Sequence, residues 1–234
     1  LIGCTAYFYS LQQLVVIEVF MIKTKEKGLL IVVSGPSGCG KSTLDNMLLD
    51  RRENIVMSIS DTTRSIRGNE VDGVDYNFIT NEQFEENIKN DKYLEYAIYN
   101  NKCYGTPEAW VDEQLNAGKD VILEIEIEGA RQVDAKRSDA VFIFIMPPSM
   151  GILKQRLVSR KTESKEQIVN RFKAAYKEIN EVAKYNYVIV NDDVETALEK
   201  MNSIITCEKC RVDRIEEVDL GNQEEIIHEI LMDM

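Results

Sequence analysis

Short apolar runs alternate with longer amphipathic segments along most of this chain. Residues 29–34 and 141–145 are almost purely apolar, which is typical of strands that are buried on both faces. Other short runs indicate further strands, and segments with helical spacing separate them. The predicted strands are residues 29–34, 55–59, 76–79, 121–127, 141–145 and 187–190, and the predicted helices are residues 42–52, 81–90, 109–117, 150–159, 166–185 and 194–205.

This alternation predicts an α/β fold with a mostly parallel sheet and helices on both of its faces. Residues 55–106 depart from the alternation because they hold more short strands and polar turns, so we expect an inserted subdomain there. Asn81 is the expected N-terminal cap of the helix at 81–90, and Gly118 is expected to end the helix at 109–117.

The composition is that of an ordinary globular protein. The chain has 234 residues, of which 44% are hydrophobic and 29% are charged, so one domain with modest additions is expected. The formal net charge of -12 makes it a poor candidate for binding the phosphate backbone of nucleic acid. Residues 1–20 are apolar but lack a basic leader region, and polar residues interrupt them, so translation from Met21 or a terminal extension explains them better than a membrane anchor.

Five cysteines with irregular spacing favour a reducing compartment over a disulfide framework, and we expect a cytoplasmic location. Cys207 and Cys210 form a C-x-x-C pair, for which His228 would be a weak third metal ligand. Two reduced thiols on a helix or tail are therefore a better interpretation than a zinc site.

The strongest local motif is G-x-x-x-x-G-K-[ST] at residues 35–42, between a predicted strand and a predicted helix. Glycines let the backbone N–H groups of such a loop turn inward, and the following helix presents its unpaired N–H groups to phosphates. Lys41 would place a positive charge near the transferring phosphoryl group, and Ser42 would supply an oxygen to Mg²⁺. We expect this loop to bind ATP through Gly35, Pro36, Ser37, Gly38, Cys39, Gly40, Lys41, Ser42 and Thr43.

A second motif occupies residues 62–79. It contains T-[ST]-R, a basic residue three positions later, an acid, a glycine and Y-x-[FY]. In these residues the chain resembles the guanylate kinases, a family of P-loop nucleoside monophosphate kinases. Paired arginine forks suit bidentate contact with a phosphate. The resemblance implies that Arg64, Arg67, Tyr76 and Tyr104 hold the phosphate of GMP.

The resemblance also implies positions that contact guanine, namely Ser60, Glu95 and Thr106. A carboxylate such as Glu95 can accept hydrogen bonds from the two adjacent donors on the pairing edge of guanine. Adenine would instead turn a lone pair toward that carboxylate, so such a site can discriminate strongly between the two bases.

A third block, residues 118–130, is similar to the family pattern G-K-x-x-[IL]-L-[DE]-I-D-x-Q-G and implies further contacts of Glu124 and Glu126 with GMP. Glu126 stands where the family usually has Asp, and Glu128 where it usually has Gln. If residues 121–127 form one strand, Glu124 and Glu126 point to the same side of the sheet.

Residues 153–162 resemble the lid of the family, R-L-x-x-R-x-T, although Ser159 and Lys161 replace its usual glycines. The resemblance implies that arginines of this region approach the transferring phosphoryl group when the lid closes, where their charge would stabilise the transition state. Arg156 is the expected ATP contact of the lid, and Asn191 is expected near the adenine end of ATP. The expected catalytic residues are Lys41, Arg64, Arg160 and Arg171.

The resemblance covers about residues 30–205 and implies a P-loop NTPase-type core, an inserted GMP-binding subdomain and a helical lid. We expect extensions at 1–27 and 207–234 around a guanylate kinase-like domain at 28–206, with its core at 28–54, 107–150 and 186–206, the GMP-binding subdomain at 55–106 and the lid at 151–185.

The implied activity is Mg²⁺-dependent transfer of the γ-phosphoryl group of ATP to GMP or dGMP in purine nucleotide metabolism. The expected partners are ATP and GMP, without nucleic acid or membrane, for a monomer or homodimer. Two alternatives stay open. Another nucleoside monophosphate kinase would not be expected to carry the acceptor motif and Glu95, and an inactive guanylate kinase-like binding module would commonly lack residues such as Lys41 or the lid arginines.

Overall fold

The computed structural model describes residues 23–159, 165–219 and 232. The chain forms two compact units, of which one is Gly28–Glu208 and the other combines the described parts of Leu1–Lys27 and Lys209–Met234. In the second unit, strand β1 (Lys23–Glu26) pairs antiparallel with β11 (Ile215–Asp219), which follows the short 3-10 helix η2 (Val212–Arg214). Among the described residues, no helix has the length and apolar character needed to cross a membrane.

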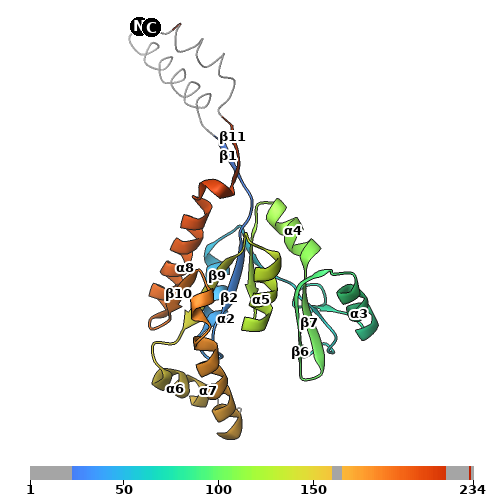
Figure 1. The fold of residues 1–234 in the computed structure, drawn as a ribbon, viewed down its shortest axis with the longest axis vertical. Helices are drawn as coiled ribbons and strands as arrows, with labels where there is room; N and C mark the ends of the chain where they lie inside the picture. The colour runs from blue at the N-terminus through green and yellow to red at the C-terminus, as the bar shows by residue number, and fades with distance from the viewer. Residues whose placement is uncertain (1–22, 160–164, 220–231, 233–234) are drawn as a thin grey trace, which may run out of the picture. The chain divides into compact units, whose positions relative to one another are not determined.

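A five-stranded parallel sheet forms the centre of the unit Gly28–Glu208 (Figure 1). Its strand order is β10-β9-β2-β8-β3, so the strand that leads into the phosphate-binding motif lies in the middle. The predicted α/β fold with a parallel core is therefore confirmed. The strands are β2 (Leu30–Ser34), β3 (Ile55–Met57), β8 (Asp120–Glu124), β9 (Val141–Met146) and β10 (Tyr187–Val190).

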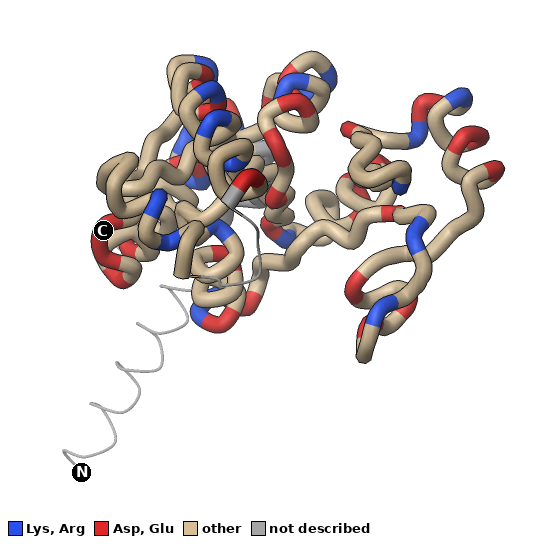
Figure 2. The backbone as a smooth tube through the Cα atoms, turned by 90° about the horizontal axis from the view of Figure 1, so that it is seen from below, with Lys and Arg blue, Asp and Glu red and all other residues tan. Residues whose placement is uncertain are grey.

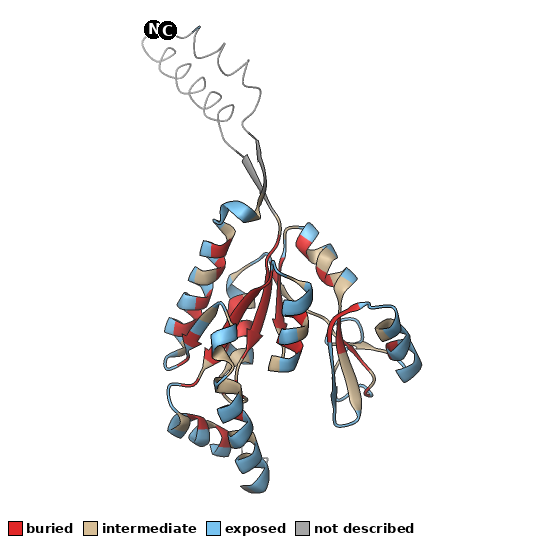
Figure 3. Ribbon diagram, viewed as in Figure 1, coloured by how far each residue is buried: buried red, intermediate tan, exposed pale blue. Residues whose placement is uncertain are grey.

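Helices cover both faces of this sheet. On β2, Ile31 and Val33 pack in one cluster with α2 (Lys41–Arg51) and α8 (Val194–Lys209). Leu30 and Val32, which point to the opposite face, pack in another cluster with α4 (Glu108–Asn116) and α5 (Ile127–Lys136). Figure 3 shows the buried positions concentrated in these strands and on the inward sides of the helices. Burial on both faces explains why the strands are apolar runs without alternation.

A second, four-stranded sheet takes its strands from residues 61–107. Its order is β5-β4-β7-β6, with a parallel β4–β5 pair and antiparallel β4–β7 and β6–β7 pairs. Phe84 of α3 (Asn81–Lys89) stacks on Tyr93 with ring centroids 4.8 Å apart. The bounds predicted for the subdomains stay predictions. The strands are β4 (Asp61–Thr62), β5 (Asn77–Phe78), β6 (Tyr93–Tyr99) and β7 (Lys102–Pro107).

Two helices, α6 (Met150–Ser159) and α7 (Lys165–Ile179), pack together around Leu153, Leu157 and Ala175. The helix predicted at 166–185 is too long, because the chain leaves α7 at Ile179 and continues into the 3-10 helix η1 (Val182–Lys184).

Two further predictions are wrong at the level of local structure. The strand predicted at 121–127 ends at Glu124, and α5, which the sequence analysis missed, begins at Ile127. Glu126 is therefore the N-cap residue of a helix and does not alternate with Glu124 along a strand. Thr80, and not Asn81, caps α3: its hydroxyl accepts from the backbone N–H of Gln83, whose side chain accepts from the Thr80 N–H.

We predict that Thr80→Ala lowers the free energy of unfolding by about 1 kcal/mol, because it removes the acceptor that caps α3. Urea unfolding monitored by circular dichroism measures this change. Thr80→Ser keeps the hydroxyl, so its free energy of unfolding should fall much less. Equal decreases in the two variants would contradict a capping role.

Candidate functional site

The phosphate-binding motif forms a tight loop between β2 and α2. Gly35 and Gly40 have φ angles of 144° and 95°, in the region that favours glycine. A Cβ atom at Gly35 would collide with the carbonyl oxygen of Ile145, and one at Gly40 would lie 2.5 Å from Nδ2 of Asn191. Gly35 and Gly40 are thus required both by backbone conformation and by close contact, Gly35 with strand β9 and Gly40 with the side chain of Asn191.

Lys41 lies at the start of α2 and folds back over the loop. Its Nζ atom donates to the carbonyl oxygen of Gly35 at 2.6 Å. A cavity of about 230 Å³ opens at this point, where the positive end of the α2 dipole favours an anion. The cavity is lined by Ser37, Gly38, Gly40, Lys41, Ser42, Thr43 and Glu124.

The side chains of Pro36 and Cys39 are buried, and Cys39 packs in the core cluster shared by α2 and α8. Burial raises the pKa of the Cys39 thiol, with Lys41 opposing the rise. These two positions can therefore face a nucleotide only through their backbone.

Glu124 lies at the carboxyl end of β8, against the phosphate-binding loop. Its Oε1 atom accepts a hydrogen bond from Oγ of Ser42 at 3.1 Å and lies 4.0 Å from Nζ of Lys41. The resemblance implied that Glu124 contacts GMP. The structure places its carboxylate beside the loop expected to bind ATP.

Three residues from later in the chain hold the loop from outside. The buried Asn191 donates from Nδ2 to the carbonyl oxygen of Cys39 at 2.8 Å. Arg156 of α6 donates to the backbone carbonyl oxygen of Asn191 at 3.0 Å and to that of Cys39 at 3.4 Å. Arg171 of α7 donates to Oγ of Ser37 at 3.4 Å. Arg156 and Asn191 also line a second cavity of about 380 Å³ next to the loop. Arg160, the remaining predicted lid arginine, lies outside the described residues.

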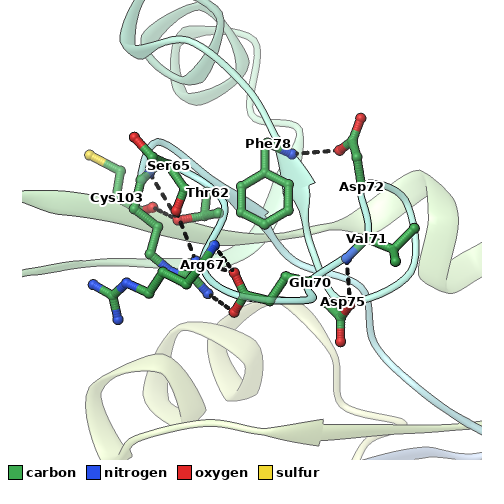
Figure 4. A network of polar contacts seen from close by, with 10 residues as sticks. Thr62, Ser65, Arg67, Glu70, Val71, Asp72, Asp75, Phe78 and Cys103 are labelled. Atoms are coloured by element: carbon green, nitrogen blue, oxygen red, sulfur yellow. Dashed lines mark hydrogen bonds and ion pairs between the residues drawn. The ribbon is translucent and has the colours of Figure 1, made fainter.

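The acceptor motif forms a bidentate ion pair in the loop between β4 and β5, where Figure 4 shows the Glu70 carboxylate bound by two guanidinium nitrogen atoms. Arg64, with 7% of its surface exposed, donates to both carboxylate oxygens of Glu70 at 2.6 and 2.7 Å. The backbone N–H of Arg67 also donates to Glu70 at 2.8 Å. These bonds, with that of Arg64 the largest cause, lower the pKa of Glu70 to about 2. Glu70 belongs to the motif, but no role was predicted for it from the sequence.

Two tyrosines complete this cluster. The guanidinium carbon of Arg64 lies 4.7 Å from the ring centre of Tyr76, and the rings of Tyr76 and Tyr104 meet edge to face at 6.0 Å. The side chain of Arg67 is exposed. Three of the four residues expected to hold the phosphate of GMP thus lie together, with the fourth on the adjoining loop.

Glu95 and Thr106 face each other across the β6–β7 hairpin, because the register pairs the two residues directly. The Thr106 hydroxyl donates to Oε1 of Glu95 at 2.6 Å, and only 6% of Glu95 is exposed. Burial raises the pKa of Glu95, while the Thr106 hydrogen bond opposes the rise. Ser60 is half-buried just before β4, where its backbone oxygen accepts from the N–H of Asn77.

Glu126 and Glu178 line a further cavity of about 220 Å³, which Lys41 also lines. Glu126 is exposed, and Glu178 of α7 is half-buried. Burial is the main cause that raises the pKa of Glu178, with Lys41 lowering it and Glu126 adding to the rise. Glu178 was not predicted from the sequence, because its place in this cavity follows from the packing of α7 and from no local motif.

Asp45 was also missed, and it is the most unusual acidic group near the site. It is 1% exposed, and neither of its carboxyl oxygens has a hydrogen-bond partner among the described residues. Burial raises its pKa to about 8, the negative charge of Glu124 adds to the rise, and Lys41 opposes it. A carboxyl group in such surroundings favours the neutral form.

Cys207 and Cys210 are free, exposed thiols, and the described part of the chain contains no group of three or more ligating side chains suited to a metal ion. His228 lies outside the described residues.

The raised pKa of Asp45 predicts a pH-dependent stability. Between the unfolded pKa of 3.8 and the folded pKa of about 8, the folded state binds more protons, so stability falls as the pH rises. We expect Asp45→Asn to gain stability relative to the natural protein by on the order of 1 kcal/mol for each pH unit between pH 5 and 8. Urea unfolding of both proteins in EDTA without nucleotide measures this difference. A difference that stays constant with pH would contradict the assignment.

Comparison with known proteins identifies the family. The sequence model of the family described as guanylate kinase matches residues 27–208. A guanylate kinase from Clostridium tetani is 54% identical over 208 residues, which cover 89% of this chain and 100% of the relative. One from Clostridium perfringens (strain SM101) is 51% identical over 212 residues, covering 91% and 98%. The crystal structure of guanylate kinase from Anaplasma phagocytophilum is 32% identical, covers 89% of this chain and 97% of that chain, and superposes with a TM-score of 0.65. With its parallel core, its phosphate-binding loop and its acceptor motif, this chain belongs to the guanylate kinase family.

Proposed function

We propose that this enzyme transfers the γ-phosphoryl group of ATP to GMP or dGMP and produces ADP and GDP or dGDP. The observation that carries the proposal is the buried pair of Glu95 and Thr106 on the β6–β7 hairpin. Strand β7 of this hairpin also carries Tyr104, which belongs to the cluster of Arg64, Tyr76 and Tyr104. The guanylate kinases that share about half of this sequence support the same acceptor.

Glu95 reads guanine through its two carboxylate oxygens. One oxygen is oriented by the Thr106 hydroxyl, which fixes the plane of the carboxylate before the nucleotide arrives. The ring N–H and the exocyclic amino group of guanine then donate to it. AMP is rejected because its unprotonated ring nitrogen would face a buried negative charge, which is costly. The hydroxyl of Ser60 and the carboxylate of Glu126 provide further contacts with the base.

The phosphate of GMP binds at Arg64, Arg67, Tyr76 and Tyr104. Glu70 holds the guanidinium of Arg64 in a fixed plane, while the exposed Arg67 is free to move to the incoming phosphate. A preoriented fork loses less conformational entropy on binding than a mobile one. The acceptor needs no general base, because its phosphate oxygen is already ionised.

ATP binds in the cavity above the start of α2, with its phosphates on the backbone N–H groups of the loop and on Lys41. Ser42 and Glu124 fit Mg²⁺, because their oxygen atoms lie 3.1 Å apart beside this cavity and Mg²⁺ prefers oxygen ligands. When bound, Mg²⁺ neutralises charge on the phosphates. The second cavity, next to Arg156 and Asn191, is the place for the adenine end.

These residues catalyse the reaction by positioning the substrates and by stabilising the negative charge on the transferring phosphoryl group. Lys41 exchanges its hydrogen bond with Gly35 for an oxygen of the transferring group. Arg171, already 3.4 Å from Oγ of Ser37, approaches the same group from α7, and Arg160 joins it when the lid closes.

The remaining expectations form part of the proposal. The enzyme acts in the cytoplasm in purine nucleotide metabolism, as a monomer or homodimer, without nucleic acid or membrane partners. Its net charge of -12 supports the absence of a nucleic-acid partner, as does the interspersion of acidic with basic positions along the chain (Figure 2).

The activity is tested by coupling ADP formation to a spectroscopic readout with GMP, AMP, dTMP and UMP as acceptors. We expect GMP to be used at least about a thousandfold better than the others in kcat/KM, because the site is built to satisfy the donors of guanine. Comparable use of AMP or a pyrimidine nucleotide would reject guanylate kinase activity. ATP binding without any transfer would favour an inactive binding module.

Lys41→Ala should lower kcat by about a hundredfold or more and leave the fold intact, because the lost charge acts on the transferring group. The same coupled assay at saturating ATP and GMP measures it, with Tm as a check of folding. Lys200→Ala, which removes an exposed lysine of α8, is the matched control and should be fully active. Near-normal turnover of the Lys41 variant would refute its role.

Glu95→Gln should raise KM for GMP by about tenfold or more and leave KM for ATP nearly unchanged. The amide keeps the shape but loses one acceptor and the charge, and hydrogen bonds to charged groups contribute about 1.5–3 kcal/mol. Steady-state kinetics with each substrate varied in turn separates the two effects. Equal weakening of both substrates would mean that Glu95 is structural.

A further inference from the structure

The first turn of α5 approaches the carboxylate of Glu95 closely. Gly129 lies in this turn and is buried. A Cβ atom at this position would lie 2.8 Å from Oε2 of Glu95 and 3.4 Å from its Cδ, where the first distance is shorter than any normal contact. Thr106 contacts the other oxygen, Oε1. The carboxylate is therefore confined from two sides, by a hydroxyl and by the bare backbone of a helix.

The backbone conformation does not itself require glycine here. Gly129 is absent from the glycines with positive φ, and it lies inside a helix, where Ala would be more favourable by about 1 kcal/mol. The space taken by Glu95 is thus the feature that a side chain at this position would violate.

The helix cannot simply move away from Glu95, because two other residues on the same face of α5 bind β6. The side-chain amide of Gln132 accepts from the N–H of Tyr96 at 3.1 Å and donates to its carbonyl oxygen at 3.0 Å. Lys136 donates to the carbonyl oxygen of Tyr93 at 2.7 Å. These contacts fix β6 on both sides of Glu95, so a larger residue at 129 must displace the carboxylate.

We infer that Gly129 is a specificity-determining position for the acceptor base: the missing side chain sets where the Glu95 carboxylate lies and so which base the site accepts. The inference rests on the proposed function, in which Glu95 reads guanine. Gly129 touches no substrate and acts through Glu95, so it is a positioning residue.

The inference leads to a difference between two purine nucleotides. GMP offers Glu95 a ring N–H and an amino group, whereas inosine monophosphate offers only the ring N–H. A displaced carboxylate can still accept one bond but cannot align with both donors. Gly129→Ala should therefore lower kcat/KM for GMP more than kcat/KM for inosine monophosphate.

The experiment measures kcat and KM of the full chain and of Gly129→Ala for GMP, inosine monophosphate and ATP, with Tm as a check of folding. We expect kcat/KM for GMP to fall by about tenfold or more, the loss of one charge-assisted hydrogen bond. The preference for GMP over inosine monophosphate should shrink, and KM for ATP should stay within about twofold. Arg131→Ala is the matched control, because Arg131 lies on the same helix but pairs with Glu128 and Glu181.

A double variant tests the contact itself. Glu95→Asp shortens the acidic side chain by one methylene, and as a single variant it should lower kcat/KM for GMP. In the double variant with Gly129→Ala, the loss in kcat/KM should be smaller than the two single losses combined, because the shorter carboxylate fits beside the new methyl group. Independent sites would instead give additive losses.

The outcomes separate the inference from the function on which it rests. Unchanged GMP kinetics in Gly129→Ala, equal losses for GMP, inosine monophosphate and ATP, or strictly additive losses in the double variant would each overturn the inference while the natural protein still phosphorylates GMP. A natural protein that does not use GMP would overturn both.

Discussion

A loop that points its N–H groups at phosphates must turn carbonyl groups the other way, and those carbonyl groups need donors. In this enzyme the Cys39 carbonyl receives Nδ2 of Asn191 and the guanidinium of Arg156, while that of Gly35 receives Lys41. Asn191 follows the edge strand β10, and Arg156 belongs to α6, so the loop depends on segments more than a hundred residues further along the chain. The conformation of this loop thus depends on distant elements of the fold, although its motif is local.

Electrostatics poses the second problem, because a chain with a net charge of -12 must hold two anionic nucleotides. The acidic groups near the site are handled in different ways. Glu70 is ionised but satisfied by Arg64, whereas burial favours the neutral form of Asp45. Glu124 lies at the one place where a cation is proposed to bind. The local field at each phosphate can therefore be positive although the global charge is negative.

How far the sequence predicts the site depends on how local the signal is. The phosphate-binding loop and the paired arginines were predictable, because their chemistry is contained in short contiguous motifs. Helix α5 was missed, because the alternation of residues 121–127 continues a strand pattern across Glu126 and because Gly129 weakens the helical signal. Asp45 and Glu178 could not have been assigned, since their burial and their neighbours are set by packing between elements far apart in sequence. Thr80 carried a readable signal in its T-x-x-Q spacing, which competed with the equally plausible cap at Asn81.

The position of Glu126 at the start of α5 shows what the replacement of the usual Asp by Glu changes in the structure. Asp is among the preferred N-cap residues because its short side chain can accept from the first free N–H groups of a helix, whereas Glu is not. Glu126 occupies the N-cap position and makes no such side-chain bond. Its carboxylate instead lines the cavity that it shares with Lys41 and Glu178. The substitution therefore exchanges a contribution to helix stability for a carboxylate that lines this cavity, while the adjoining turn keeps Gly129 against Glu95. The two carboxylates proposed to read the base are thus positioned by one helix end, Glu126 as its cap and Glu95 by the space left in its first turn.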